Sequence, residues 1–98
     1  MTELEYAKFV DLKWRNLLTG YGADKVAAAL GLAGEAGEVV DLIKKQFSHG
    51  KLVPSVRIVE ELGDVEFYLA KLRSLYGIDR FEVLIANRLK LDKRYPER

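Results

Sequence analysis

The chain has 98 residues, of which 16 are basic and 15 acidic, so its formal net charge is only +1 and its length suits a single domain. This balance gives no electrostatic footprint for nucleic-acid polymers or an anionic membrane, and we expect neither as a partner. Cysteine is absent, which excludes disulfides, thiolate metal sites and a cysteine nucleophile. The acidic start and the lack of a long apolar run lead us to expect a soluble cytoplasmic protein with one domain over residues 1–98.

The apolar content is high for so short a chain, since hydrophobic residues make up 49% of it. A domain of this size leaves a large share of its surface exposed, and apolar residues must then be covered by other means. We therefore expect self-association, as a homodimer or a tetramer built from dimers.

Helix-forming residues fill four segments, which are separated by short clusters of turn residues. The expected helices cover residues 2–18, 25–47, 54–75 and 80–94. Thr2 with Glu5 is typical of a capping box, and Asp24 and Asp79 are suited to cap the second and fourth helices. No segment alternates as a strand does. The sequence therefore predicts an all-α fold, a compact four-helix bundle-like domain.

The second expected helix carries two acids at or inside its apolar arc. A helical wheel places Glu35 within this arc and Glu38 at its edge. The arc that we expect to face the core consists of Ala29, Ala33, Ala36, Val40, Ile43 and Phe47.

The third expected helix repeats this arrangement. Glu61 points into its apolar side and Asp64 lies at the border, again three residues apart and therefore on one side of the helix. Its expected core residues are Ile58, Leu62, Val65, Leu69, Leu72 and Tyr76.

Two acid pairs at half-buried positions predict a bound cation. Like charges at this spacing repel, and a half-buried carboxylate costs free energy unless a cation pairs with it. Ligands that are all oxygen suit a hard ion, so we expect Mg²⁺, with Mn²⁺ as the alternative. The expected ligands are Glu35, Glu38, Glu61 and Asp64. The competing interpretation is that these are ordinary solvated acids on amphipathic helices.

A di-iron bundle also uses inward-facing carboxylates, but it needs Glu-x-x-His from two helices. His49 is the single histidine and falls in an expected loop. We exclude the di-iron site and assign His49 no role.

Several motifs together resemble one known family. Gly31-Leu-Ala-Gly-Glu-Ala-Gly-Glu-Val-Val-Asp41 followed by Glu60-Glu-Leu-Gly-Asp-Val65 is similar to the Glu-x-x-Glu and Glu-x-x-Asp signature of MazG-like nucleotide pyrophosphohydrolases. The stretch Lys44-Lys-Gln-Phe-Ser-His-Gly50 and the ending Asn87-Arg-Leu-Lys-Leu-Asp-Lys-Arg-Tyr-Pro96 also resemble this family. The resemblance runs in register from Gly31 to Pro96.

The resemblance implies an enzyme that hydrolyses ribo- or deoxyribonucleoside triphosphates to a monophosphate and pyrophosphate, with Mg²⁺ held by the four acids. Many relatives have a further glutamate where this chain has Gly34, so the base that activates water is expected to be Glu38 or Glu61, unless the metal alone suffices.

Basic and aromatic residues are candidates for contact with the nucleotide. Lys90 and Arg94 share one face of the last expected helix with Asn87 and are suited to phosphate. Lys44 and Trp14 are further candidates, for phosphate and for stacking on a base. Their ordinary roles, a snorkelling lysine and a core tryptophan, remain as alternatives.

Two other functions remain open. A phosphoribosyl-ATP pyrophosphohydrolase resembles this superfamily in fold and acidic pairs, although the closing motif favours the MazG-like branch. A non-catalytic helical interaction module would instead show no response to Mg²⁺.

Overall fold

The structure is a computed structural model in which residues 1–97 are described. These residues form four helices and no strand, α1 (Glu3–Lys13), α2 (Ala23–Ser48), α3 (Ser55–Leu75) and α4 (Arg80–Arg94). The all-α prediction is therefore confirmed. Within the same residues no helix combines the length and hydropathy needed to cross a membrane.

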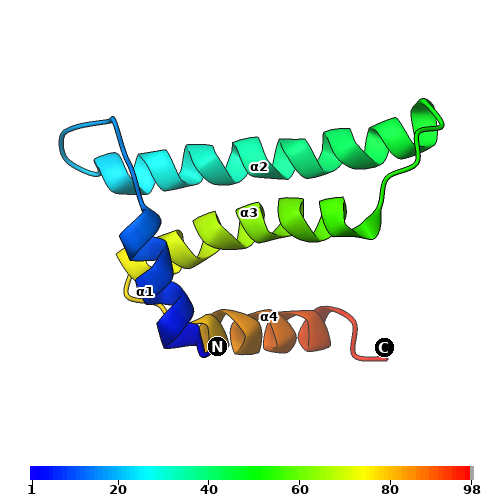
Figure 1. The fold of residues 1–98 in the computed structure, drawn as a ribbon. Helices are drawn as coiled ribbons and strands as arrows, with labels where there is room; N and C mark the ends of the chain where they lie inside the picture. Colours follow the sequence, from blue (N-terminus) through cyan, green and yellow to red (C-terminus); the bar gives the residue numbers. More distant parts are fainter. Residues whose placement is uncertain (98) are drawn as a thin grey trace.

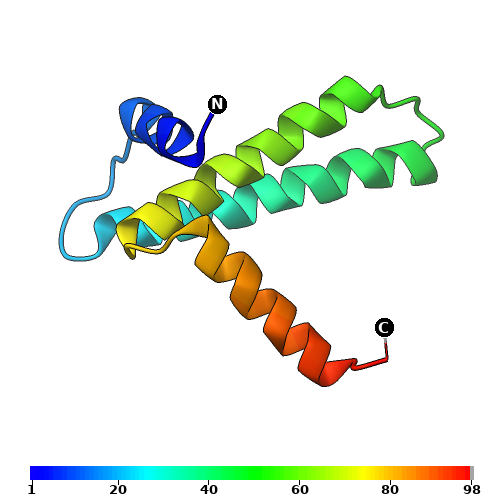
Figure 2. The same cartoon turned by 90° about the horizontal axis from the view of Figure 1, so that it is seen from below.

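The centre of the molecule is a hairpin of the two long helices. α2 and α3 run antiparallel and side by side. α1 lies across the hairpin near the end at which α2 begins and α3 ends, and α4 leaves the same end in another direction (Figures 1 and 2). Gly50 and Gly77 have φ of 63° and 64°, in the left-handed region that favours glycine, after the ends of α2 and α3.

The predicted caps have two different outcomes. The Asp79 carboxylate accepts from the Phe81 backbone N–H at 2.7 Å, and the Glu82 side chain accepts from the Asp79 N–H at 3.4 Å, which makes a capping box. The prediction for Asp24 is wrong, because α2 begins at Ala23, two residues earlier than predicted, and Gly22 occupies the N-cap position.

The first helix ends at Lys13 and not at residue 18 as predicted. The Trp14 backbone is extended, with ψ of 132°. The Arg15 guanidinium donates to the carbonyls of Leu12 and Trp14, at 3.3 and 2.7 Å, so it satisfies acceptors that the end of the helix leaves open.

The core of the described chain is small. Val10, Ala28 and Ala70 are its buried apolar side chains, and α4 has none. The predicted core face of α2 is wrong, because Val40 and Phe47 on that face are 65% and 79% exposed. α2 is apolar on two sides, and the side that packs on α3 is the one that carries Ala28 and Glu35.

Candidate metal centre

Three of the four predicted ligands converge between α2 and α3. Glu35 on α2 and Glu61 and Asp64 on α3 each offer a carboxylate oxygen, and these oxygens lie within 4.8 Å of one another. Glu61 and Asp64 meet because positions three apart share a helix side, and the antiparallel hairpin brings Glu35 opposite them. Glu35 and Glu61 are half-buried, whereas Asp64 is exposed.

The close approach of the two helices depends on Gly31. A Cβ atom at this position would overlap the ring of Tyr68. Gly31 lies one turn before Glu35, and Tyr68 lies one turn after Asp64, so this contact is adjacent to the acids along both helices. The missing side chain therefore allows the three carboxylates to come together.

Glu35 is the member of this cluster whose negative charge is disfavoured by its surroundings. Burial raises the pKa of the Glu35 carboxyl, and the neighbouring carboxylates of Asp64, Glu61 and Glu38 raise it further. In residues 1–97 no basic side chain forms an ion pair with Glu35, whereas Glu61 accepts from the Arg57 guanidinium at 3.2 Å. Glu35 is therefore the acid that would benefit most from a cation.

The donor set fits a hard divalent ion. All three ligand atoms are carboxylate oxygens that lie within 4.8 Å of one another. Around octahedral Mg²⁺, neighbouring ligand oxygens lie about 3.0 Å apart and opposite ones about 4.2 Å apart, so the three side chains would draw together around a bound ion. Neither histidine nor cysteine contributes, which disfavours zinc and the other softer ions.

The fourth predicted ligand, Glu38, does not belong to the converging group that the described residues form. Its side chain is exposed, one turn along α2 from Glu35, and near enough to raise the pKa of Glu35. The structure therefore places Glu38 beside the cluster.

The predicted phosphate-binding residues lie apart from the acids. Asn87, Lys90 and Arg94 are exposed on α4, which points away from the hairpin (Figure 2). Lys44 is exposed on the last turns of α2, next to an ion pair of 2.8 Å between Lys45 and Asp41.

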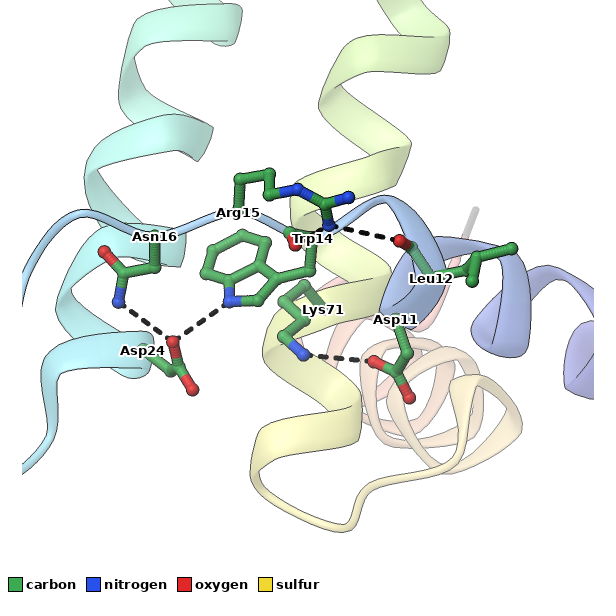
Figure 3. Close-up of polar contacts among 7 residues, drawn as sticks. All are labelled: Asp11, Leu12, Trp14, Arg15, Asn16, Asp24 and Lys71. Carbon is green, nitrogen blue, oxygen red and sulfur yellow. Dashed lines mark hydrogen bonds and ion pairs between the residues drawn. The ribbon is translucent and has the colours of Figure 1, made fainter.

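Trp14 is held in a network at the α1 end of the hairpin (Figure 3). Its indole N–H donates to Asp24 at 3.0 Å, and Asn16 donates to the same carboxylate oxygen at 2.9 Å. These two bonds lower the pKa of Asp24. Lys71, buried and paired with Asp11 at 3.0 Å, lies 5.0 Å from the Trp14 ring. The contacts of Trp14 are those of a packed residue that ties the loop after α1 to α2 and α3.

Arg57 is not among the residues predicted from the sequence to belong to the site, although its spacing from Glu61 carries a signal. Arg57 and Glu61 are four residues apart on a predicted helix, a spacing that commonly forms an ion pair. Gly31 could not be found in this way, because its role depends on which residue of the facing helix it meets.

One comparison with known proteins gives a match. The sequence model of a family described as the MazG nucleotide pyrophosphohydrolase domain matches residues 25–98, a stretch that includes all four predicted ligands. Comparisons with curated proteins and with solved structures gave no match.

Proposed function

We propose a function for this chain from its family, since it belongs to the family of the MazG nucleotide pyrophosphohydrolase domain. The proposed reaction is the Mg²⁺-dependent hydrolysis of ribo- or deoxyribonucleoside triphosphates to the monophosphate and pyrophosphate. The observation that carries the proposal is the convergence of Glu35, Glu61 and Asp64 inside the matched region. Without a cation the neighbouring carboxylates and burial disfavour the charged form of Glu35, which has no basic ion-pair partner within residues 1–97.

The acidic residues would divide two tasks. Glu35, Glu61 and Asp64 would hold Mg²⁺ or Mn²⁺, and Glu38 would join them by rotation of its exposed side chain. When bound, the ion supplies the positive charge that lets a triphosphate approach four carboxylates. Cleavage of the anhydride between the α- and β-phosphates also needs a group that accepts a proton from water, and we assign this role to Glu38 or Glu61.

Self-association is part of the proposal, and the exposed surface supports it. The chain exposes 7820 Å², whereas a compact monomer of 11.1 kDa exposes about 5,700 Å². The excess of about 2,100 Å² per chain would give a pair an interface of the size that obligate dimers have. The apolar sides of α2 and α4 that the chain leaves uncovered supply the surface.

The direction of α4 favours contributions to the site from two copies. Lys90 and Arg94 are suited to phosphate, yet α4 points away from the α2–α3 hairpin of its own chain (Figure 2). In our proposal a second copy covers the apolar side of α4 and brings Asn87, Lys90 and Arg94 near a triphosphate. Lys44 would bind the same ligand from the end of α2.

The activity is tested with a panel of ribo- and deoxyribonucleoside triphosphates and phosphoribosyl-ATP, each with Mg²⁺ or with a chelator. We expect monophosphate and pyrophosphate only when Mg²⁺ is present. Asp64→Asn should abolish turnover, while the matched control Glu60→Gln, an exposed acid next to Glu61, should retain it. Release of orthophosphate, or equal turnover by Asp64→Asn, would contradict the proposal.

The oligomeric state is tested by sedimentation at micromolar concentration. We expect the mass of two or four chains, and Ile85→Lys on the exposed apolar side of α4 should lower it. A wild-type mass equal to one chain would refute self-association.

A further inference from the structure

A basic residue beside the candidate metal centre forms an ion pair with one of the ligands. Arg57 lies one turn before Glu61 on α3, and its Nη2 is 3.2 Å from Glu61 Oε1. Its Nη1 is 3.8 Å from Glu60 Oε2. The Glu61 side chain is 13% exposed, compared with 49% for Arg57, so the ion pair joins a largely buried carboxylate to a guanidinium at the surface.

This contact gives the cluster a positive charge of its own. Three carboxylates with oxygens within 4.8 Å repel one another, and the described residues offer them Arg57 as their ion-pair partner. A charged hydrogen bond to a half-buried carboxylate stabilises it more than a contact on the open surface does. Arg57 therefore makes the cluster tolerable when no ion is bound.

The same contact must weaken the binding of an ion. A divalent cation at the cluster would share Glu61 with the guanidinium, which withdraws negative charge from that carboxylate. The guanidinium also repels the cation directly, because both are positive and lie against one side chain. Both effects have the same sign.

We propose that Arg57 is the resident counter-ion of the acidic cluster, and that it lowers the affinity of the site for divalent cations by sharing Glu61 with them. This inference rests on the metal site of the proposed function. Arg57 acts through Glu61 and is a positioning residue in this sense. Its ion pair stabilises the protein when no ion is bound and weakens the binding of the ion. The site then fills and empties with the supply of the ion.

The test is a titration of the full chain with Mg²⁺ by calorimetry and with Mn²⁺ by electron paramagnetic resonance, at fixed ionic strength. Arg57→Gln should bind either ion about 15-fold more tightly, the change expected when one positive charge about 5 Å from a divalent ion is removed in a water-like dielectric. In chelator the same variant should melt at a lower temperature than wild type. Arg57→Lys keeps the charge, so its affinity should stay close to that of wild type.

The matched control is Arg88→Gln. Arg88 also lies four residues from an acid, Asp92, at 3.8 Å, but on exposed α4. It should leave the ion affinity unchanged, which separates a local effect of Arg57 from the change in net charge. If wild type binds the ions and Arg57→Gln binds them equally or more weakly, the role proposed for Arg57 is wrong, but the metal site still stands. A wild-type chain that binds neither ion overturns the metal site and thus the proposed function.

Discussion

Replacing Glu35 with glutamine should stabilise the protein when no ion is present and weaken it when Mg²⁺ is added. Glutamine keeps the shape of the side chain and removes its charge. Glu35 is the best position for this test because, within residues 1–97, it has no basic partner and its pKa is raised by burial and by Asp64, Glu61 and Glu38. Glu61→Gln is less clean, since it also deprives Arg57 of its partner.

The size of the effect follows from the geometry. Two unit charges 4.8 Å apart repel by about 0.9 kcal/mol even in a dielectric as high as that of water, and Glu35 faces two such neighbours. Removal of this repulsion should therefore stabilise the ion-free protein by about 1 to 2 kcal/mol. For a domain of this size, about 1 kcal/mol moves the melting midpoint by roughly 4 to 8 °C.

The assay is thermal unfolding followed by circular dichroism, in chelator and along a Mg²⁺ titration. Protein concentration must be held fixed, because self-association alone shifts the midpoint. In chelator Glu35→Gln should melt several degrees above wild type at neutral pH. We expect Mg²⁺ to bind the native state and to raise the wild-type midpoint more, until the order of the two proteins reverses.

The pH dependence gives the test a second readout. The pKa of Glu35 is higher in the folded chain than its usual value, so its ionisation penalises the folded state. This penalty is absent below the unfolded pKa and develops as the pH rises through the folded pKa. The advantage of Glu35→Gln should therefore vanish in acid and grow towards neutral pH.

The control is Glu66→Gln, which removes one negative charge from an exposed position of α3 outside the converging group. It should differ from wild type by at most about 0.5 kcal/mol in either condition. If Glu35→Gln behaves like this control, with the same midpoint in chelator and the same response to Mg²⁺, then the carboxylates do not repel one another and our reasoning about the cluster is wrong.

Three further predictions follow from the contacts. Gly31→Ala should destabilise the protein by about 1 to 3 kcal/mol in urea unfolding, because the new methyl group overlaps the Tyr68 ring, and an unchanged midpoint would show that the helices are not closely packed there. Trp14→Phe should cost about 1 kcal/mol, since the hydrogen bond to Asp24 is lost, and nucleotide binding measured alongside tests whether the indole also stacks on a base. Mg²⁺ affinity of wild type should fall as the pH drops through the raised pKa of Glu35, and a flat profile by calorimetry would argue against its role as a ligand.

The helices could be predicted because their signals are local. Asp79 with Glu82 marks the start of α4, and the predicted bounds of that helix agree with the structure. The end of α1 could not be predicted in this way. Apolar spacing continues past Lys13, and the chain leaves the helix where Trp14 and Asn16 bind Asp24, a partner that only the fold supplies.

In the candidate site, too, some features follow from local sequence signals and others depend on how the helices pack. Helical periodicity places Glu61 on the inner side of α3, and the structure brings it together with Glu35 and Asp64. Glu35 does lie on an inner side, but that side carries Ala28 and is not the apolar arc that we predicted to face the core. The periodicity of α2 also led to a wrong core face, because this helix has apolar residues on two sides and the sequence does not say which side meets α3. Whether Glu38, Lys90 and Arg94 take part stays a prediction.

The fourth helix has a consequence for how the protein would behave at low abundance. α4 buries no side chain of its own, and an isolated helix of 15 residues is only marginally stable in water. If a second copy provides its packing surface, the helix would gain its order only when chains meet. Dilution would then leave the last fifth of the chain open to proteases, and the enzyme would be both active and long-lived only above a threshold number of copies in the cell.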